Sequence, residues 1–244
     1  MSDYVDIPRP ISSEKRPFPA RSSAASPGRF RSAETPLAYS NGVGASSLAR
    51  EVNLAPGPVS WLRLAPRYDP RRTWTVAELE EAATGHDFVF APYGMGRGAY
   101  AIGSFRDEDG FGSWVTHGRD YRTLWASFIF TTGEIWGVDA LTMNINGGLI
   151  QFDLPMMVQA LNCYRDLLRR LWIDGPYRWT AGMEGTNNRS LAPATRATLF
   201  QPEGLARCDE IVAEGELTDE QDASEAARGF LAAIHEALGL ATPK

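Results

Sequence analysis

The chain has 244 residues, of which 43% are hydrophobic and 22% are charged, and its formal net charge is −6. These values are ordinary for a globular protein, and the length suffices for one domain with a tail. The acidic balance argues against a dedicated nucleic-acid binder, which usually presents a basic face. The sequence has no apolar run long enough to cross a membrane and no apolar secretory region at its start. We therefore expect a cytoplasmic protein without a membrane partner.

Residues 1–50 differ in composition from the rest of the chain. Six prolines and clustered serines interrupt any regular pattern, and periodic apolar residues are absent. Such a segment cannot bury enough apolar surface to offset its conformational entropy, so we expect a disordered N-terminal arm. The arm carries seven basic and four acidic residues, so its net charge is +3. The net charge of residues 51–244 is therefore −9. A solvated tail and an arm that contacts phosphate or an acidic partner both stay open.

The folded part is expected to run from residue 58 to residue 240 as one α+β domain. Short β-rich runs predict strands over residues 59–64, 88–90, 99–105, 111–116, 124–130, 134–141 and 177–183. Asp109 and Gly110 form a strong hairpin signal, and Gly133 offers a turn in which φ is positive. The region from residue 98 to 143 therefore predicts an antiparallel meander, and one of its faces has to be covered.

Two long amphipathic helices, predicted over residues 153–172 and 218–239, are expected to cover this sheet. Their leucines, alanines and aromatic residues recur at helical spacing. Thr218 is the expected N-cap of the second helix, because Gln221 follows three residues later. A shorter helix is predicted over residues 75–83.

Large aromatic side chains contribute heavily to core burial, and the tryptophans locate the core. All seven lie between residues 61 and 179. We expect most of them to be core residues rather than binding platforms. They are Trp61, Trp74, Trp114, Trp125, Trp136, Trp172 and Trp179.

Four aromatic and turn motifs follow one another along the chain. They are WLRLAP (residues 61–66), TWTVAEL (73–79), TTGEIWG (131–137) and GPYRWTAGMEG (175–185). In this order they resemble the region that follows the DNA-binding module in bacterial AlbA-like, Schlafen-related transcriptional regulators. The resemblance covers residues 58–190, and its motifs are not catalytic signatures. Because the arm stands where that module should be, the resemblance implies an accessory domain of a DNA-associated protein, without the module's own activity.

No catalytic or metal-binding signature is assembled in the sequence. The three histidines do not have metal-ligand spacing, and Cys163 and Cys208 form no C-x-x-C pair. We expect no metal, no cofactor and no disulfide. Candidate acid–base groups are His117, Glu134, Asp139 and Glu184. Candidate binding residues are Trp136, beside Glu134, and the polar cluster Asn187, Asn188 and Arg189.

Three hypotheses follow for the function. The first is a non-enzymatic interaction or regulatory domain, which binds a protein partner or a second copy of itself. The second is a hydrolase that acts on a nucleotide or nucleic acid, which requires the candidate acid–base groups to converge in one pocket. The third is salt-sensitive binding of nucleic acid through residues 1–50.

Overall fold

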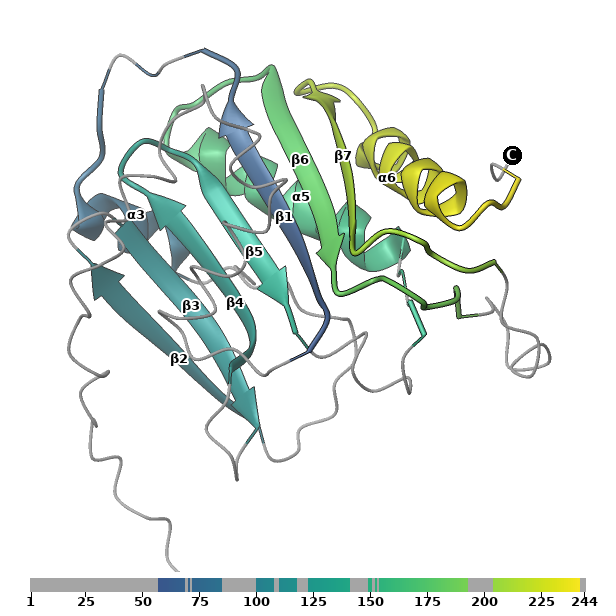
Figure 1. The fold of residues 1–244 in the computed structure, drawn as a ribbon. Coiled ribbons are helices and arrows are strands. Elements are labelled where there is room, and N and C mark those ends of the chain that lie inside the picture. Colours follow the sequence, from purple (N-terminus) through teal and green to yellow (C-terminus); the bar gives the residue numbers. More distant parts are fainter. Residues whose placement is uncertain are drawn as a thin grey trace, which may run out of the picture.

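A computed structural model describes residues 57–68, 70, 72–84, 100–107, 110–117, 123–140, 149–150, 152, 154–192 and 204–241. The arm expected to be disordered and the strand predicted over residues 88–90 lie outside these residues. Within them the chain forms one antiparallel sheet and three helices (Figure 1), which is the α+β class that the sequence predicts.

Seven strands form the sheet. They are β1 (Val59–Pro66), β2 (Tyr100–Asp107), β3 (Gly110–His117), β4 (Thr123–Phe130), β5 (Ile135–Asp139), β6 (Tyr177–Glu184) and β7 (Glu210–Leu217). Their order across the sheet is β2-β3-β4-β5-β1-β6-β7, and every neighbouring pair is antiparallel. A simple meander does not account for this order, because β1 lies between β5 and β6. Strand β7 was not expected from the sequence.

The two turns read from the sequence have the expected form. Asp107 pairs with Gly110, so two residues connect β2 to β3. Gly133 has a φ of +81° in the turn between β4 and β5, and its N–H donates to the carbonyl of Phe130 over 2.8 Å. A Cβ at Gly133 would stand less than 3.0 Å from the Cδ1 of Ile173, so glycine leaves room for Ile173 to pack against this turn.

The helices are α3 (Val76–Ala83), α5 (Leu154–Arg170) and α6 (Ala223–Ala237). Thr75 and Glu78 form the capping box of α3. The N-cap of α6 is Asp222, which accepts from the N–H of Ser224, so the prediction that Thr218 caps this helix is wrong. Thr218 and Gln221 instead bond to each other's main chain in the turn before it. No described helix is both long and apolar enough to cross a membrane.

The two faces of the sheet have different surroundings. All three helices bury apolar residues in one cluster with Leu62, Leu64 and other side chains of one face, and Figure 1 shows α5 and α6 on that side. The opposite face carries a second cluster, to which no helix contributes among the described residues. Its buried members are Val59, Trp61, Ala126, Phe128, Phe130, Trp136, Val138 and Ala140. The alternation of side chains along β1, β4 and β5 explains this division.

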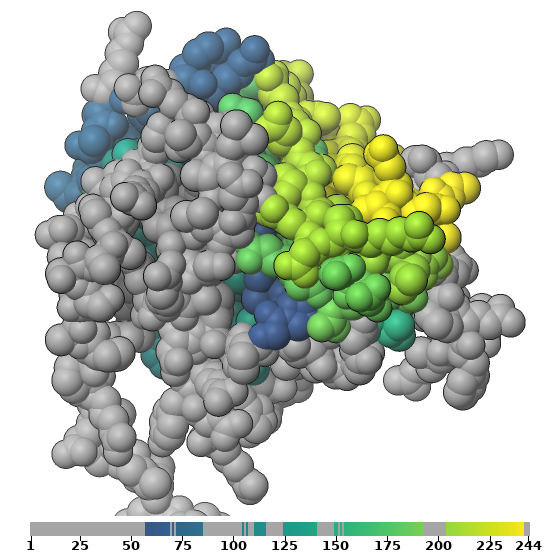
Figure 2. All heavy atoms as spheres, viewed as in Figure 1, coloured from purple at the N-terminus to yellow at the C-terminus, as the bar shows by residue number. Residues whose placement is uncertain are grey.

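The two ends of the sheet are formed by different connections. At one end β1 begins beside the residue that follows β6, since a side chain at Gly185 would contact Pro58, and Figure 2 shows these two segments at the surface together. At the other end Pro66 pairs with Tyr177, and the N–H of Arg67 donates to the carbonyl of Pro176 over 3.1 Å. The loops after β1 and before β6 therefore meet at this second end.

Candidate functional site

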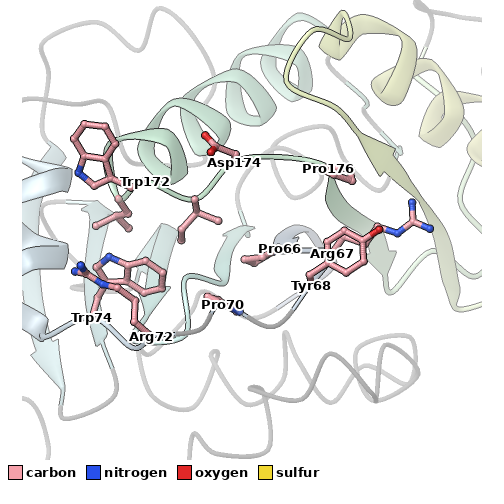
Figure 3. Close-up of a pocket in the computed structure, with 11 residues that line it drawn as sticks. Pro66, Arg67, Tyr68, Pro70, Arg72, Trp74, Trp172, Asp174 and Pro176 are labelled. Atoms are coloured by element: carbon pink, nitrogen blue, oxygen red, sulfur yellow. The ribbon is translucent and has the colours of Figure 1, made fainter.

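A cleft of about 450 Å³ opens where these two loops meet (Figure 3). One wall comes from the segment between β1 and α3, and the other from the segment between α5 and β6. Three aromatic rings and three prolines dominate the lining, together with two arginines and one aspartate. The lining residues are Pro66, Arg67, Tyr68, Pro70, Arg72, Trp74, Leu171, Trp172, Ile173, Asp174 and Pro176.

Trp172 is held at the rim of this cleft by the way α5 ends. The N–H of Ile173 donates to the carbonyl of Leu168 over 3.0 Å, and the N–H of Trp172 donates to the carbonyl of Arg169 over 2.9 Å. These two bonds are the Schellman motif, whose residue with positive φ is usually glycine. Here that residue is Trp172, with a φ of +60°, and its side chain is 89% exposed. A bulky residue in this conformation is a backbone outlier, and such strain is concentrated at functional sites.

The facing wall presents Tyr68, whose side chain is 69% exposed. The guanidinium of Arg67 lies 5.7 Å from the centre of the Tyr68 ring, and that of Arg72 lies 5.0 Å from the centre of the Trp74 ring. In Figure 3, Trp172 and Trp74 stand near one end of the cleft and Arg67 and Tyr68 near the other. Each arginine is within the range of a cation–π interaction, so both rings are held by a charged neighbour.

Both arginines are also paired with carboxylates. Arg67 forms an ion pair with Glu216, and Arg72 forms one with Glu78 at 2.8 Å. Asp174 is exposed in the lining and forms no ion pair within the described part of the chain. The charge that the cleft leaves uncompensated is therefore negative.

Asp219 fixes the loop that carries Trp172. Its Oδ2 accepts the N–H of Gly175 over 2.6 Å, and its Oδ1 accepts the Arg169 Nε over 2.9 Å and the Tyr177 hydroxyl over 3.0 Å. The Arg169 Nη2 also donates to the main-chain carbonyl of Asp219 over 2.6 Å. One carboxylate thus binds the end of α5, the loop and the start of β6.

The electrostatics of this carboxylate follow from its partners. Burial opposes its charge, but the bonds from Gly175, Arg169 and Tyr177 hold the pKa of Asp219 below its usual value. Burial and the neighbouring carboxylate raise the pKa of the Tyr177 hydroxyl. The bond to Asp219 raises the pKa of Arg169. Asp219 and Arg169 are therefore charged near neutral pH, and Tyr177 is a neutral donor.

Glu134 does not contact the cleft. It is buried, with 3% of its surface exposed, and receives two hydrogen bonds from Arg63, at 2.6 Å from Nε and 2.9 Å from Nη2. Arg63 is equally buried. A bidentate pair of this kind satisfies both charges where water is excluded, so Glu134 has a structural role at this position.

The other candidates on β5 are buried as well. Trp136 is 3% exposed, so it is not the surface aromatic expected beside Glu134. Asp139 is buried at the far end of the strand, opposite Ser60 and Trp125. Alternation along β5 directs Asp139 to the face opposite Trp136.

Glu184 ends β6 and lies beside an acidic neighbour. It pairs in register with Glu210 of β7. Burial, the charge of Glu210 and that of Asp209 raise the pKa of Glu184 to about 7. This pair is at the end of the sheet opposite the cleft. Glu134, Asp139 and Glu184 therefore do not form one cluster, and the side chain of His117 lies outside the described residues.

The polar cluster after β6 is a turn. Asn188 has a φ of +58°, a conformation that asparagine tolerates, and its N–H donates to the carbonyl of Ala206 over 2.9 Å. The Arg189 Nε donates to the carbonyl of Gly185. Asn187 and Asn188 are exposed. These contacts hold the loop before β7 against the end of β6.

No group of metal-ligating side chains occurs among the described residues. Neither Cys163 nor Cys208 forms a disulfide within the described residues. The chemistry available at the cleft is thus ring stacking, apolar contact and one free carboxylate.

The sequence prediction missed the cleft. Trp61, Trp74, Trp125, Trp136 and Trp179 are buried, as expected of core residues. Trp114 is half-buried and Trp172 is exposed; one signal pointed to the exposure of Trp172. It follows Leu171 directly, and neighbours in sequence do not share a helix face. Tyr68, Asp174 and Asp219 gave no signal, because their proximity depends on the long-range pairing of β6 with β1 and β7.

Comparison with family models, with curated protein sequences and with solved structures found no match. The resemblance to AlbA-like regulators therefore stays a prediction.

Proposed function

We propose that this chain is an interaction domain that binds an extended polypeptide segment of a partner in the cleft between Tyr68 and Trp172. The observation that supports this most directly is Trp172 itself. It is strained in its backbone and almost fully exposed, and neither property contributes to stability. Tyrosine and tryptophan are enriched among the residues that dominate binding energy at protein interfaces.

The lining favours a polypeptide over a nucleic acid. Aromatic rings with basic neighbours also occur in sites that stack nucleobases. Here, however, Glu216 and Glu78 compensate both arginines, and Asp174 would repel a phosphate. Phosphate contacts supply most of the affinity of a nucleic acid for a protein. A nucleic acid would gain little here, because both arginines are already paired with carboxylates. An apolar or basic peptide has no such penalty.

The proposal is tested by peptide selection. A library of displayed peptides is selected on the immobilised full chain, and the affinity of recovered peptides is measured by fluorescence anisotropy. Trp172→Gly and Tyr68→Ala are expected to weaken binding by at least about tenfold, the size of a typical anchor residue. Leu205→Ala is the control, because Leu205 is also a large exposed apolar side chain, at 47%, but lies near the opposite end of the sheet.

Three results would overturn the proposal. They are the recovery of no peptide ligand, affinity that does not change in the Trp172 and Tyr68 variants, or equal loss in the Leu205 control. A labelled single-stranded oligonucleotide is measured in parallel. If it alone binds with dependence on Trp172, the cleft is a nucleic-acid site and the polypeptide proposal is wrong.

A further inference from the structure

The cleft has a composition that restricts its ligand. Its walls offer the exposed rings of Tyr68 and Trp172 and the rings of three prolines, and the buried Trp74 also lines it. Proline-rich segments dock on aromatic-lined grooves of this kind, because they are extended before binding and lose little conformational entropy. The first requirement for a ligand is therefore proline in an extended stretch.

Charge supplies the second requirement. Asp174 is the carboxylate in the lining without an ion pair to the described residues, and Trp172 presents an exposed ring two residues before it. An arginine or lysine can pair with the carboxylate and lie over the indole face. A ligand that combines proline with a basic residue therefore satisfies both groups.

The chain itself contains such a segment. Residues 15–21 read KRPFPAR, with two prolines, three basic residues and one phenylalanine. Residues 1–50, which include this segment, have a net charge of +3, whereas the remaining 194 residues have a net charge of −9. The 35 residues from 22 to 56 can extend to roughly 120 Å. Strand β1, which separates residue 57 from the cleft, is only about 26 Å long, so the segment can reach the cleft of its own chain.

We propose that residues 15–21 are the ligand of the cleft between Tyr68 and Trp172, with Pro17 and Pro19 against the aromatic rings and a flanking basic residue on Asp174. This rests on the proposed function, since it names the chemistry of the segment that the cleft binds. Residues 15–21 therefore compete for the cleft with partner segments that carry the same pattern of prolines and basic residues.

The test is photo-cross-linking in the full chain. Benzoylphenylalanine replaces Tyr68, and mass spectrometry identifies the residues that become attached to it after irradiation. Attachment to the tryptic fragments of residues 15–21 is the expected result. The same probe at Leu205 is the control and should not attach there. Attachment of the Tyr68 probe only to other segments, or to none, would overturn the inference.

A second measurement separates this inference from the proposed function. The peptide of residues 11–25, labelled, is titrated into the full chain and into its Pro17→Ala, Phe18→Ala, Pro19→Ala triple variant. The triple variant should bind at least about fivefold more tightly, because its own segment no longer competes. Asp174→Asn in that variant should weaken binding again. Equal affinity for both chains contradicts the inference, whereas the proposed function still stands if selected peptides depend on Trp172.

Discussion

Asp219 and Gly175 are joined by a hydrogen bond of 2.6 Å from the main-chain N–H to the carboxylate. The two residues lie on different segments, one before α6 and one before β6. A Cβ at Gly175 would stand 3.0 Å from the same carboxylate oxygen, so glycine leaves room for this close approach. The bond connects the C-terminal part of the chain to the loop that presents Trp172.

Replacement of Asp219 by asparagine should destabilise the fold by about 1–3 kcal/mol near neutral pH, because a charged acceptor of several bonds is lost. The pKa of Asp219 in the folded protein is lowered below its usual 3.8. The carboxylate therefore stabilises the fold above pH 3.8, and this stabilisation is lost as the pH falls through the pKa of the folded protein. Urea unfolding should therefore show that the difference in free energy of unfolding between the parent protein and the Asp219→Asn variant narrows below about pH 4. A difference that stays constant with pH would contradict this role.

Trp172→Gly should be neutral or stabilise the protein by up to about 1 kcal/mol, although it removes a large aromatic side chain. Glycine adopts the positive φ without the steric cost of about 1–2 kcal/mol that tryptophan has there. Part of this gain is lost, because glycine has more conformational freedom in the unfolded chain. Little burial is lost, because the indole is 89% exposed. Trp172→Ala is the matched control, since alanine keeps the strain. Thermal unfolding in which the glycine variant is less stable than the alanine variant would refute the argument.

The hairpins and the long helices were predictable because local signals agree with the tertiary structure. Gly110 and Gly133 mark their turns, and the apolar spacing between residues 154 and 170 has the helical period. Strand β7 gave no such signal. Its sequence contains Glu214, Gly215 and Glu216, which have low β propensity. Pairing with β6 and packing against α6 impose the strand.

Gly215 shows why this strand tolerates a poor β former. A side chain there would stand 2.7 Å from the Trp179 ring, so the glycine leaves room for a buried indole. The cleft was unpredictable for a similar reason. Its two walls are about 100 residues apart in sequence and meet only through the long-range pairing of β1 with β6. Local patterns carry no information on such contacts.

The buried pair of Arg63 and Glu134 should show strong coupling. Replacement of either residue alone removes the bidentate partner of a buried charge, which costs about 3–5 kcal/mol. The double variant Arg63→Met, Glu134→Leu should cost much less than the sum of the single variants. A double-mutant cycle by urea unfolding measures this coupling, with the exposed pair of Arg178 and Glu214 as the control. The control pair should couple by less than about 1 kcal/mol. Similar coupling in both pairs would contradict the structural role assigned to Glu134.

Glu184 should make the protein less stable as pH rises. Its pKa is raised from 4.5 to about 7, chiefly by burial and then by Glu210. Below pH 4.5 the carboxyl is protonated in both states. Between 4.5 and 7 the folded state keeps a proton that the unfolded state releases, so the favourable contribution is lost as pH rises through about 7.

Glu184→Gln removes this titration. The variant should gain about 1–2 kcal/mol relative to the parent protein between pH 5 and pH 8.5, a range that allows for the partial exposure of the group. Glu210→Gln removes only the neighbouring charge and leaves the burial, so it should produce a smaller gain over the same interval. Unfolding in urea at a series of pH values measures both. If the stability of Glu184→Gln ran parallel to that of the parent at all pH values, the raised pKa would be wrong. If Glu210→Gln gave the larger gain, repulsion rather than burial would be the main cause of the shift.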